Sequence, residues 1–441
     1  MTKRLLAFSL ALLASLALTA AANPWRAYEG TTIVVSWPAM YHFEVAAQFI
    51  PQFTEETGIQ VELDSVAYMN MRDRQVVEIS RPARGDLDVV AWVVFSKGEY
   101  VGNQWLTPLA PFLINPRLTA PDYDIDDIVP AFLTTCCKVG GRKGYLDGPG
   151  ASLYGIPFSP ETSILVYRKD IFEEYDLEVP TTYDELLETA AWITDNVPDI
   201  YGMTTRGSAG HQVIHAWLLH LAPYGGTVFD DDFMPVVNSP EAIEAAYALK
   251  TILENSPPGM AAAGAGEQDA AFLQGDSAIY LDRSIVAAMA ADPAQSRVVG
   301  NVGYALHPTQ AQCGAETGGF AMGIPANSQQ KEAAWLFIQW FTSKRIDLEI
   351  AMAGGNPTRT STHADPELQA MFPWYATVVD QLPCATADWR PLIPEWPAIN
   401  APILGEEMSA ALTGQKTIEE ALESANRRIY ELMDRAGYYS W

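Results

Sequence analysis

The segment 153–184 constrains the fold more than any other part of the chain. A Gly-Ile-Pro turn at 155–157 leads into the apolar run 163–167 (SILVY), which is typical of a buried strand. The charged residues 168–170 (RKD) follow at once and open an amphipathic helix, and the sequence PTTYD at 180–184 caps the next helix. A buried strand that passes straight into two helices predicts an α/β fold.

The same alternation of strands and helices continues on both sides of this segment. Apolar or alternating runs predict strands at 31–36, 60–64, 87–95, 278–282 and 303–306. Helical spacing of apolar residues predicts helices at 41–57, 182–196, 211–221, 239–254, 330–342 and 417–436, and another that ends near residue 79. Gly58 ends the first helix, Ser239 with Pro240 begins another, and the small residues at 259–266 predict a loop. The alternation predicts a parallel sheet with helices on both faces.

The first 22 residues have the pattern of a secretory signal peptide. Lys3 and Arg4 precede the apolar run 5–18, and the alanines at 20–22 supply a cleavage site that places the mature start near Asn23. The alternative is a membrane anchor, but the apolar run is shorter than the ~20 residues that span a bilayer. No cysteine follows the run, so no lipoprotein anchor is expected. We expect a soluble mature chain in the periplasm or outside the cell.

The chain is strongly acidic. Its formal charge is −27, and it becomes −29 without Lys3 and Arg4. This charge argues against nucleic acid and anionic membranes as partners, but it says little about a neutral ligand. About 420 residues remain after the predicted cleavage, which is enough for two or more domains.

The four cysteines are Cys136, Cys137, Cys313 and Cys384. Export permits disulfides, and four cysteines allow three pairings. Cys136 and Cys137 are not expected to bridge each other, because bridged Cα atoms prefer more than ~4.4 Å and a trans peptide separates them by only ~3.8 Å. One or two long-range bridges are therefore expected. A metal site is less favoured, because the chain has no Cys-x-x-Cys spacing.

Several short motifs occur in an order that resembles one protein family. They are DVVAW at 88–92 with WLTPL at 105–109, the segment 153–170, FLQGDSAI at 272–279, GGFAMGIP at 318–325 with KEAAW at 331–335, and GGNPTR at 354–359. Together they resemble the extracellular solute-binding proteins of carbohydrate ABC importers, which are similar to maltose-binding protein. Each motif is weak alone, and their shared order carries the resemblance, which covers nearly the whole mature chain.

The resemblance implies the type II periplasmic-binding-protein fold, with two α/β lobes, hinge crossings and a ligand cleft between the lobes. The implied N-terminal lobe is 23–160 plus 318–355, and the implied C-terminal lobe is 161–317 plus 356–441. The implied function is capture of a sugar or sugar alcohol, followed by lobe closure and delivery to a membrane permease. No cofactor and no metal are expected, and the protein is expected to be a monomer that performs no chemistry.

Three positions depart from the commonest family pattern. Residues 282–284 read Asp-Arg-Ser where many relatives have Asp-Gly-x-Trp, Phe320 replaces a common Trp, and the lipoprotein cysteine is missing. The first two changes leave fewer stacking surfaces for a long oligosaccharide. The segment 390–396 (RPLIPEW) is similar to the sorbitol- and mannitol-binding subgroup. A monosaccharide or a sugar alcohol is therefore the expected ligand.

A polyhydroxyl ligand needs planar groups that serve two neighbouring hydroxyls, and aromatic faces against its C–H patches. The candidates from loops at strand ends and from the family motifs are Trp37, Tyr41, Trp92, Glu161, Thr162, Arg206, His211, Tyr224, Asp282, Arg283, Gly319, Phe320, Asn356 and Arg359. In open parallel sheets, ligands sit beyond the carboxyl ends of the strands, which agrees with this choice.

Several of these candidates also have structural interpretations. Core packing is the alternative for the aromatic candidates Trp37, Trp92 and Phe320, and holding the crossing in place is the alternative for Glu161. Asp282 and Arg283 would alternatively pair with each other across an exposed turn, and Arg359 would anchor the backbone of the second lobe. Trp335 and Trp340 lie at helical spacing among apolar residues, so both are expected in the core.

Two enzyme classes remain as alternatives. His211 and His215 have the i, i+4 spacing of a zinc protease, but Gln212 occupies the position of the general base, and an amide cannot take up a proton. An exported glycan hydrolase is the stronger alternative, since it needs only two carboxylates across a cleft. Most acidic residues, however, are typical of solvated faces or turns.

Overall fold

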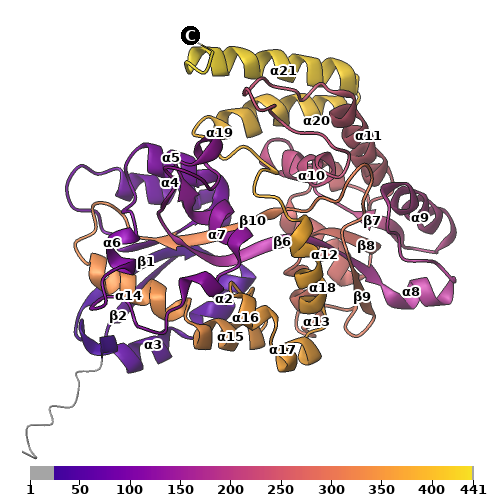
Figure 1. Cartoon of the computed structure of the whole chain (residues 1–441). Helices are drawn as coiled ribbons and strands as arrows, with labels where there is room; N and C mark the ends of the chain where they lie inside the picture. Colours follow the sequence, from indigo (N-terminus) through magenta and orange to yellow (C-terminus); the bar gives the residue numbers. More distant parts are fainter. Residues whose placement is uncertain (1–23, 440–441) are drawn as a thin grey trace, which may run out of the picture.

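The computed structural model describes residues 24–439. The predicted signal peptide, residues 1–22, lies outside the described residues. Two α/β lobes stand side by side, and the strands β6 (Ile156–Arg168) and β10 (Thr317–Gly323) run through the region between them (Figure 1). One continuous path of strands, β2-β1-β3-β10-β6-β8-β7, connects the lobes, and β9 also pairs with β6. This is the two-lobe arrangement expected from the sequence.

The first lobe is built around β1 (Thr32–Pro38), β2 (Gln60–Val66) and β3 (Val89–Val93), which are parallel to one another. Its helices are α2 (Tyr41–Ala47), α3 (Ile50–Thr57), α4 (Tyr68–Ile79), α5 (Lys97–Gly102), α6 (Ala110–Leu113), α7 (Pro130–Cys137), α14 (Lys331–Phe341) and α15 (Lys344–Met352). The orange elements α14, α15 and β10 lie among the indigo elements in Figure 1, so the chain returns to this lobe after leaving it. Trp335 and Trp340 of α14 are fully buried, as expected.

The second lobe is built around β7 (Tyr201–Thr204), β8 (Ser277–Arg283) and β9 (Val302–Ala305). Its helices include α8 (Lys169–Glu174), α9 (Tyr183–Asn196), α10 (His211–Leu221), α11 (Pro240–Glu254), α12 (Ala265–Gln274), α13 (Val286–Ala291), α18 (Trp374–Gln381), α20 (Glu406–Leu412) and α21 (Ile418–Arg435). The side chains of Thr182 and Ser239 cap α9 and α11, as the sequence predicts. The yellow helices α20 and α21 cover the outer side of α10 and α11 (Figure 1).

Strand β6 belongs to both lobes. Its first half pairs antiparallel with β10, up to the pair Thr162 and Thr317, and its second half pairs antiparallel with β8 from the pair Ser163 and Arg283 onward. The sheet is therefore mixed, and the parallel pairing predicted from the alternation of strands and helices is found only within each lobe. The parallel pairs, β1 with β2 and β3 and β7 with β8, stay inside each lobe, because there helical crossovers join the strands.

The helix predicted over 41–57 and the loop predicted over 259–266 differ from the structure. The helix predicted over 41–57 is broken into α2 and α3, because Pro51 has no N–H for a helical hydrogen bond and instead lies in the first turn of α3. The loop predicted over 259–266 contains a short turn, Met260–Ala262, and α12 already begins at Ala265. Gly58 ends α3 in the left-handed conformation (φ 73°), as predicted.

One disulfide joins Cys313 to Cys384, while Cys136 and Cys137 are buried thiols. This confirms one long-range bridge and the absence of a bridge between the adjacent pair. The disulfide ties the segment before β10 to the segment after α18. Within residues 24–439, no helix combines the length and the hydropathy needed to cross a bilayer.

Candidate functional site

A small cavity of about 50 Å³ lies between the lobes, where β6 and β10 cross. It is lined by residues of both lobes: Met40, Tyr68, Val93, Val94, Phe95, Glu161, Arg206, His211, His215, Ala265, Arg283, Glu316, Gly319, Phe320 and Arg390. Two hollows adjoin it. One, of about 410 Å³, shares Met40, Tyr68 and Arg283, and the other, of about 190 Å³, shares Tyr68 and His211. The interlobe region therefore joins a small cavity, lined by charged, aromatic and aliphatic residues, to two wider hollows.

Arg206 and Asp282 form a buried ion pair at one wall of this cavity. Because β7 and β8 are parallel neighbours, their carboxyl ends meet at one edge of the sheet and bring the two residues together. Arg206 donates from Nε (2.9 Å) and from one terminal nitrogen (2.6 Å) to Oδ2 of Asp282. Burial alone would raise the pKa of Asp282, but Arg206 and His215 hold it well below its usual range. Asp282 is thus a fixed negative charge.

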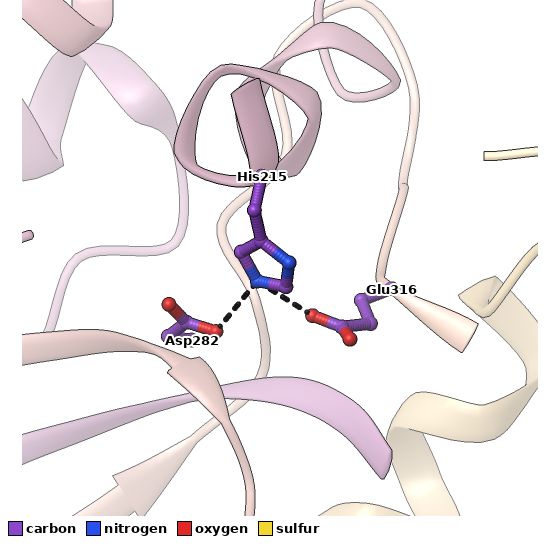
Figure 2. A group of neighbouring side chains, drawn as sticks. All are labelled: His215, Asp282 and Glu316. Carbon is purple, nitrogen blue, oxygen red and sulfur yellow. Dashed lines mark hydrogen bonds and ion pairs between the residues drawn. The ribbon is translucent and has the colours of Figure 1, made fainter. Parts of the chain in front are cut away.

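His215 joins this pair to Glu316 (Figure 2). Its Nε2 lies 3.0 Å from Oδ1 of Asp282 and 3.1 Å from Oε2 of Glu316. Its Nδ1 faces a terminal nitrogen of Arg390 at 3.0 Å. Arginine only donates, so Nδ1 accepts and the single ring proton is on Nε2, between the two carboxylates.

The same three side chains have the spacing of a metal site, since their ligand atoms lie within 4.8 Å of one another. The surrounding donors oppose that use. A metal-binding histidine donates its second N–H to an acceptor, whereas the second nitrogen of His215 accepts from Arg390. Asp282 already forms an ion pair with Arg206. The cluster is better described as a network of compensated charges.

Arg283 and Asp269 form a second buried pair. A terminal nitrogen of Arg283 lies 2.9 and 2.7 Å from the two carboxylate oxygens of Asp269, and Tyr280 donates to the same carboxylate at 2.9 Å. The sequence left open that Asp282 and Arg283 pair with each other across an exposed turn. Both residues are instead buried in β8, and their side chains bind different partners. The interpretation as an exposed turn is therefore wrong.

Arg390 enters the site from the segment after the disulfide. Its guanidinium lies 3.8 Å from the ring centre of Trp389 and 5.8 Å from that of Phe95. Burial lowers the pKa of Arg390 to about 10, so it stays cationic at neutral pH. Its Nε has no hydrogen-bond partner among the described residues. Arg390 thus keeps a donor available at the cavity.

Glu161 lies on β6 at the floor of the cavity. The residue is 4% exposed, and its Oε1 has no hydrogen-bond partner among residues 24–439. Burial raises the pKa of Glu161 to about 8, and the partial attraction of Arg283 does not cancel this effect. The nearby Glu316 and Asp282 raise it further.

The structure brings together eight of the residues selected from the sequence. Six line the cavity, Tyr41 lines the adjoining 410 Å³ hollow, and Asp282 holds Arg206 behind the cavity wall. The six are Glu161, Arg206, His211, Arg283, Gly319 and Phe320.

The other candidates line neither the cavity nor the two adjoining hollows. They are Trp37, Trp92, Thr162, Tyr224, Asn356 and Arg359. Trp37 packs in the aromatic core of the first lobe, and Trp92 donates to the carbonyl of Cys136 (3.3 Å). Arg359 is fully buried, and it binds the carbonyls of Tyr123, Asp124 and Thr342, so it anchors backbone of the first lobe.

Sequence reasoning missed several side chains of the site. The polar ones are Tyr68, His215, Glu316 and Arg390. Two had a visible signal: His215 follows His211 by one helical turn, and Arg390 opens the motif at 390–396 that resembles the polyol-binding subgroup. Glu316 and Tyr68 had none, because only the fold brings the start of β10 and the start of α4 to the same cavity.

Comparison with known proteins identifies the family. The family model described as "Bacterial extracellular solute-binding protein" matches residues 43–346. The chain belongs to this family. This solute-binding protein is also 30% identical over 391 residues to the mannitol-binding protein of Pseudomonas aeruginosa, a match that covers 83% of this chain and 85% of the relative.

Solved structures of solute-binding proteins share the fold. An Agrobacterium radiobacter protein in complex with ribitol has a TM-score of 0.81 at 29% identity, and the match covers 92% of this chain and 99% of that chain. An Agrobacterium vitis protein with bound D-mannitol has a TM-score of 0.80 at 28% identity, covering 93% and 100%. The two-lobe fold and membership among the solute-binding subunits of ABC transporters therefore agree with the expectation from the sequence.

Proposed function

We propose that this solute-binding protein captures a sugar alcohol or a monosaccharide in the interlobe cavity and delivers it to a membrane permease. The observation that carries the proposal is the charge-compensated cavity, which combines free polar donors with aromatic walls. The cations Arg206, Arg283 and Arg390 are balanced by Asp282, Asp269 and Glu316, which favours an uncharged ligand. The similarity to proteins that bind mannitol and ribitol supports the same class.

The chemistry of the walls suits a polyhydroxyl compound. Arg390 Nε and Arg283 Nε are buried without a hydrogen-bond partner among residues 24–439, so each offers a donor. Glu161 Oε1 offers an acceptor, and burying any of these groups unpaired is unfavourable. Tyr68, Phe95 and Phe320 supply apolar faces for the C–H patches of a ligand.

The size of the cavity supports a clamp mechanism. A volume of 50 Å³ is well below the ~300–1,000 Å³ of typical ligand pockets. We therefore infer that the lobes separate to admit ligand and then close on it. A ligand that touches both lobes binds the closed form better, and this difference in affinity shifts the population toward closure.

The proposal also covers the division into lobes, the location of the protein and the fate of its ligand. The lobes are proposed to divide as 23–160 plus 318–355 and 161–317 plus 356–441, which is supported by the exchange of pairing partners in the middle of β6. The protein is proposed to act as a periplasmic or extracellular monomer that releases its ligand chemically unchanged. Incubation with each candidate sugar should therefore give no new product by mass spectrometry.

A thermal-shift screen of the chain from Asn23 tests the proposal. The panel holds sugar alcohols, monosaccharides, uronates and oligosaccharides. A ligand at ~100 times its dissociation constant adds about 2.7 kcal/mol to stability, so binding is easily detected. A shift with sugar alcohols or monosaccharides supports the proposal. If only a charged or non-carbohydrate solute binds, including one released by denaturing the purified protein, the proposal fails.

A further inference from the structure

We propose that ligand capture is coupled to the uptake of one proton by Glu161, so that affinity falls as pH rises. This inference rests on the proposed function, because it concerns the same cavity. It adds a second solute, the proton, to the binding reaction. The argument begins from the position of Glu161 on β6, the strand common to both lobes.

The carboxyl group of Glu161 is buried in the cavity. Glu161 lines the cavity and is 4% exposed, and its Oε1 has no hydrogen-bond partner in the described part of the chain. Among residues 24–439, no Lys, Arg or His nitrogen lies within ion-pairing distance of it, whereas Asp282, Asp269 and Glu316 each have such a partner.

The groups that face Glu161 come from every element around the cavity. They are Asp282 and Arg283 of β8, Arg206 after β7, His211 and His215 of α10, Glu316 before β10, Tyr68 of α4, Cys136 of α7, and Arg390. The three guanidinium charges are matched by the carboxylates of Asp282, Asp269 and Glu316. An ionised Glu161 would thus be a fourth, uncompensated negative charge in the closed cavity, which is unfavourable away from water.

Burial raises the pKa of Glu161 to about 8 in this closed arrangement, so the carboxyl is protonated at neutral pH. Separation of the lobes admits water to the floor of the cavity, and a hydrated glutamate titrates near pH ~4.3. Between these values the closed form holds one more proton than the open form. Closing therefore takes up a proton, and the closed form is favoured by lower pH.

The proton also has a role in recognition. A protonated carboxyl donates one hydrogen bond and accepts another, so Glu161 can serve two neighbouring hydroxyls of a ligand. The ionised form only accepts. Glu161 is therefore proposed as a specificity-determining residue whose donor exists only in the closed cavity.

Calorimetric titration with D-mannitol and ribitol tests the coupling. Binding enthalpies in phosphate and in HEPES at one pH give the number of protons exchanged. The expected uptake is about 0.9 proton per ligand at pH 7, and the expected loss of affinity is about 50-fold between pH 6 and pH 8. The variant Glu161→Gln keeps a neutral side chain of the same shape, so it should bind at pH 6 with little proton uptake and little dependence on pH.

The matched control is Glu174→Gln, which removes an exposed carboxylate on α8. It should retain the proton uptake of the unchanged protein. Binding without proton exchange between pH 6 and pH 8 would overturn the inference and leave the proposed function intact, as would uptake that persists in Glu161→Gln. The measurement on the unchanged chain decides even if that variant fails to fold. If no sugar or sugar alcohol binds at any pH, the proposed function itself fails and the inference fails with it.

Discussion

The substitution Asp282→Asn should destabilise the protein strongly, because Asp282 is the buried anion at the centre of the site. It is fully buried and accepts hydrogen bonds from Arg206 (2.9 and 2.6 Å), from His215 (3.0 Å) and from the backbone N–H of Arg283 (2.8 Å). An asparagine has one amide oxygen, so it can accept hydrogen bonds either from Arg206 or from His215 and the N–H of Arg283, but not from both sets of donors. If the oxygen faces Arg206, the new NH₂ group meets the N–H donors of His215 and Arg283.

The expected loss follows from these contacts. The change removes at least one hydrogen bond between charged partners, worth ~1.5–3 kcal/mol, and leaves Arg206 buried without a counter-charge. Breaking a buried pair in this way typically costs ~3–5 kcal/mol, so we expect a loss of about 3–5 kcal/mol in the free energy of unfolding. Burial would raise the pKa of Asp282, but Arg206 and His215 hold it low, so this stability is present above the ordinary pKa of an aspartate and disappears only in strong acid.

Urea denaturation at pH 7 without ligand measures this loss. The control is Asp86→Asn, because Asp86 pairs with Arg81 at an exposed position (side chains 70% and 44% exposed) and should change stability by less than ~0.5 kcal/mol. The double variant Arg206→Met with Asp282→Leu should recover much of the loss, since it removes both charges. If Asp282→Asn unfolds at the same urea concentration as the control, the buried pair does not stabilise the fold as argued.

Three further predictions concern other contacts. Arg359→Ala should lower the free energy of unfolding by at least ~3 kcal/mol, because three backbone carbonyls lose their hydrogen-bond donor. The affinity of the folded protein for D-mannitol should stay unchanged. Urea denaturation measures the first effect and calorimetry the second, and a loss of affinity without a loss of stability would contradict the prediction. Cys313→Ser should lower the free energy of unfolding by ~2–4 kcal/mol by removing the bridge to Cys384, and reductant should then lower it no further. Cys136→Ser removes a free thiol and keeps the bridge, so reductant should still lower its free energy of unfolding; denaturation of both variants with and without reductant checks this. Arg390→Lys should weaken D-mannitol binding about 10-fold or more, because a lysine ammonium has neither the planar group that stacks on Trp389 nor the paired N–H donors of a guanidinium. An unchanged affinity would show that Arg390 does not contact the ligand.

The sequence predicts the elements well because their signals are local. The caps at Thr182 and Ser239 and the left-handed Gly58 each act within one turn of chain. The site depends on contacts between distant segments. Asp282 and Arg283 are neighbours in sequence, but successive residues of a strand face opposite sides, so one meets Arg206 and the other meets Asp269. Nothing near Asp282 in the sequence identifies a partner 76 residues away.

The position of β10 has a consequence for the order in which this chain can fold. β10 lies in the middle of the sheet between β3 and β6, yet it is formed by residues 317–323, after the strands of the second lobe have been made. During synthesis, β3 and β6 thus emerge well before β10, the strand that pairs with both of them. The pairing of β3 with β10 closes a long loop. Such non-local pairing slows folding and leaves strand edges exposed meanwhile. Neither lobe can reach its final form as an N-terminal fragment, and truncation before residue 317 should yield a chain that binds chaperones rather than ligand.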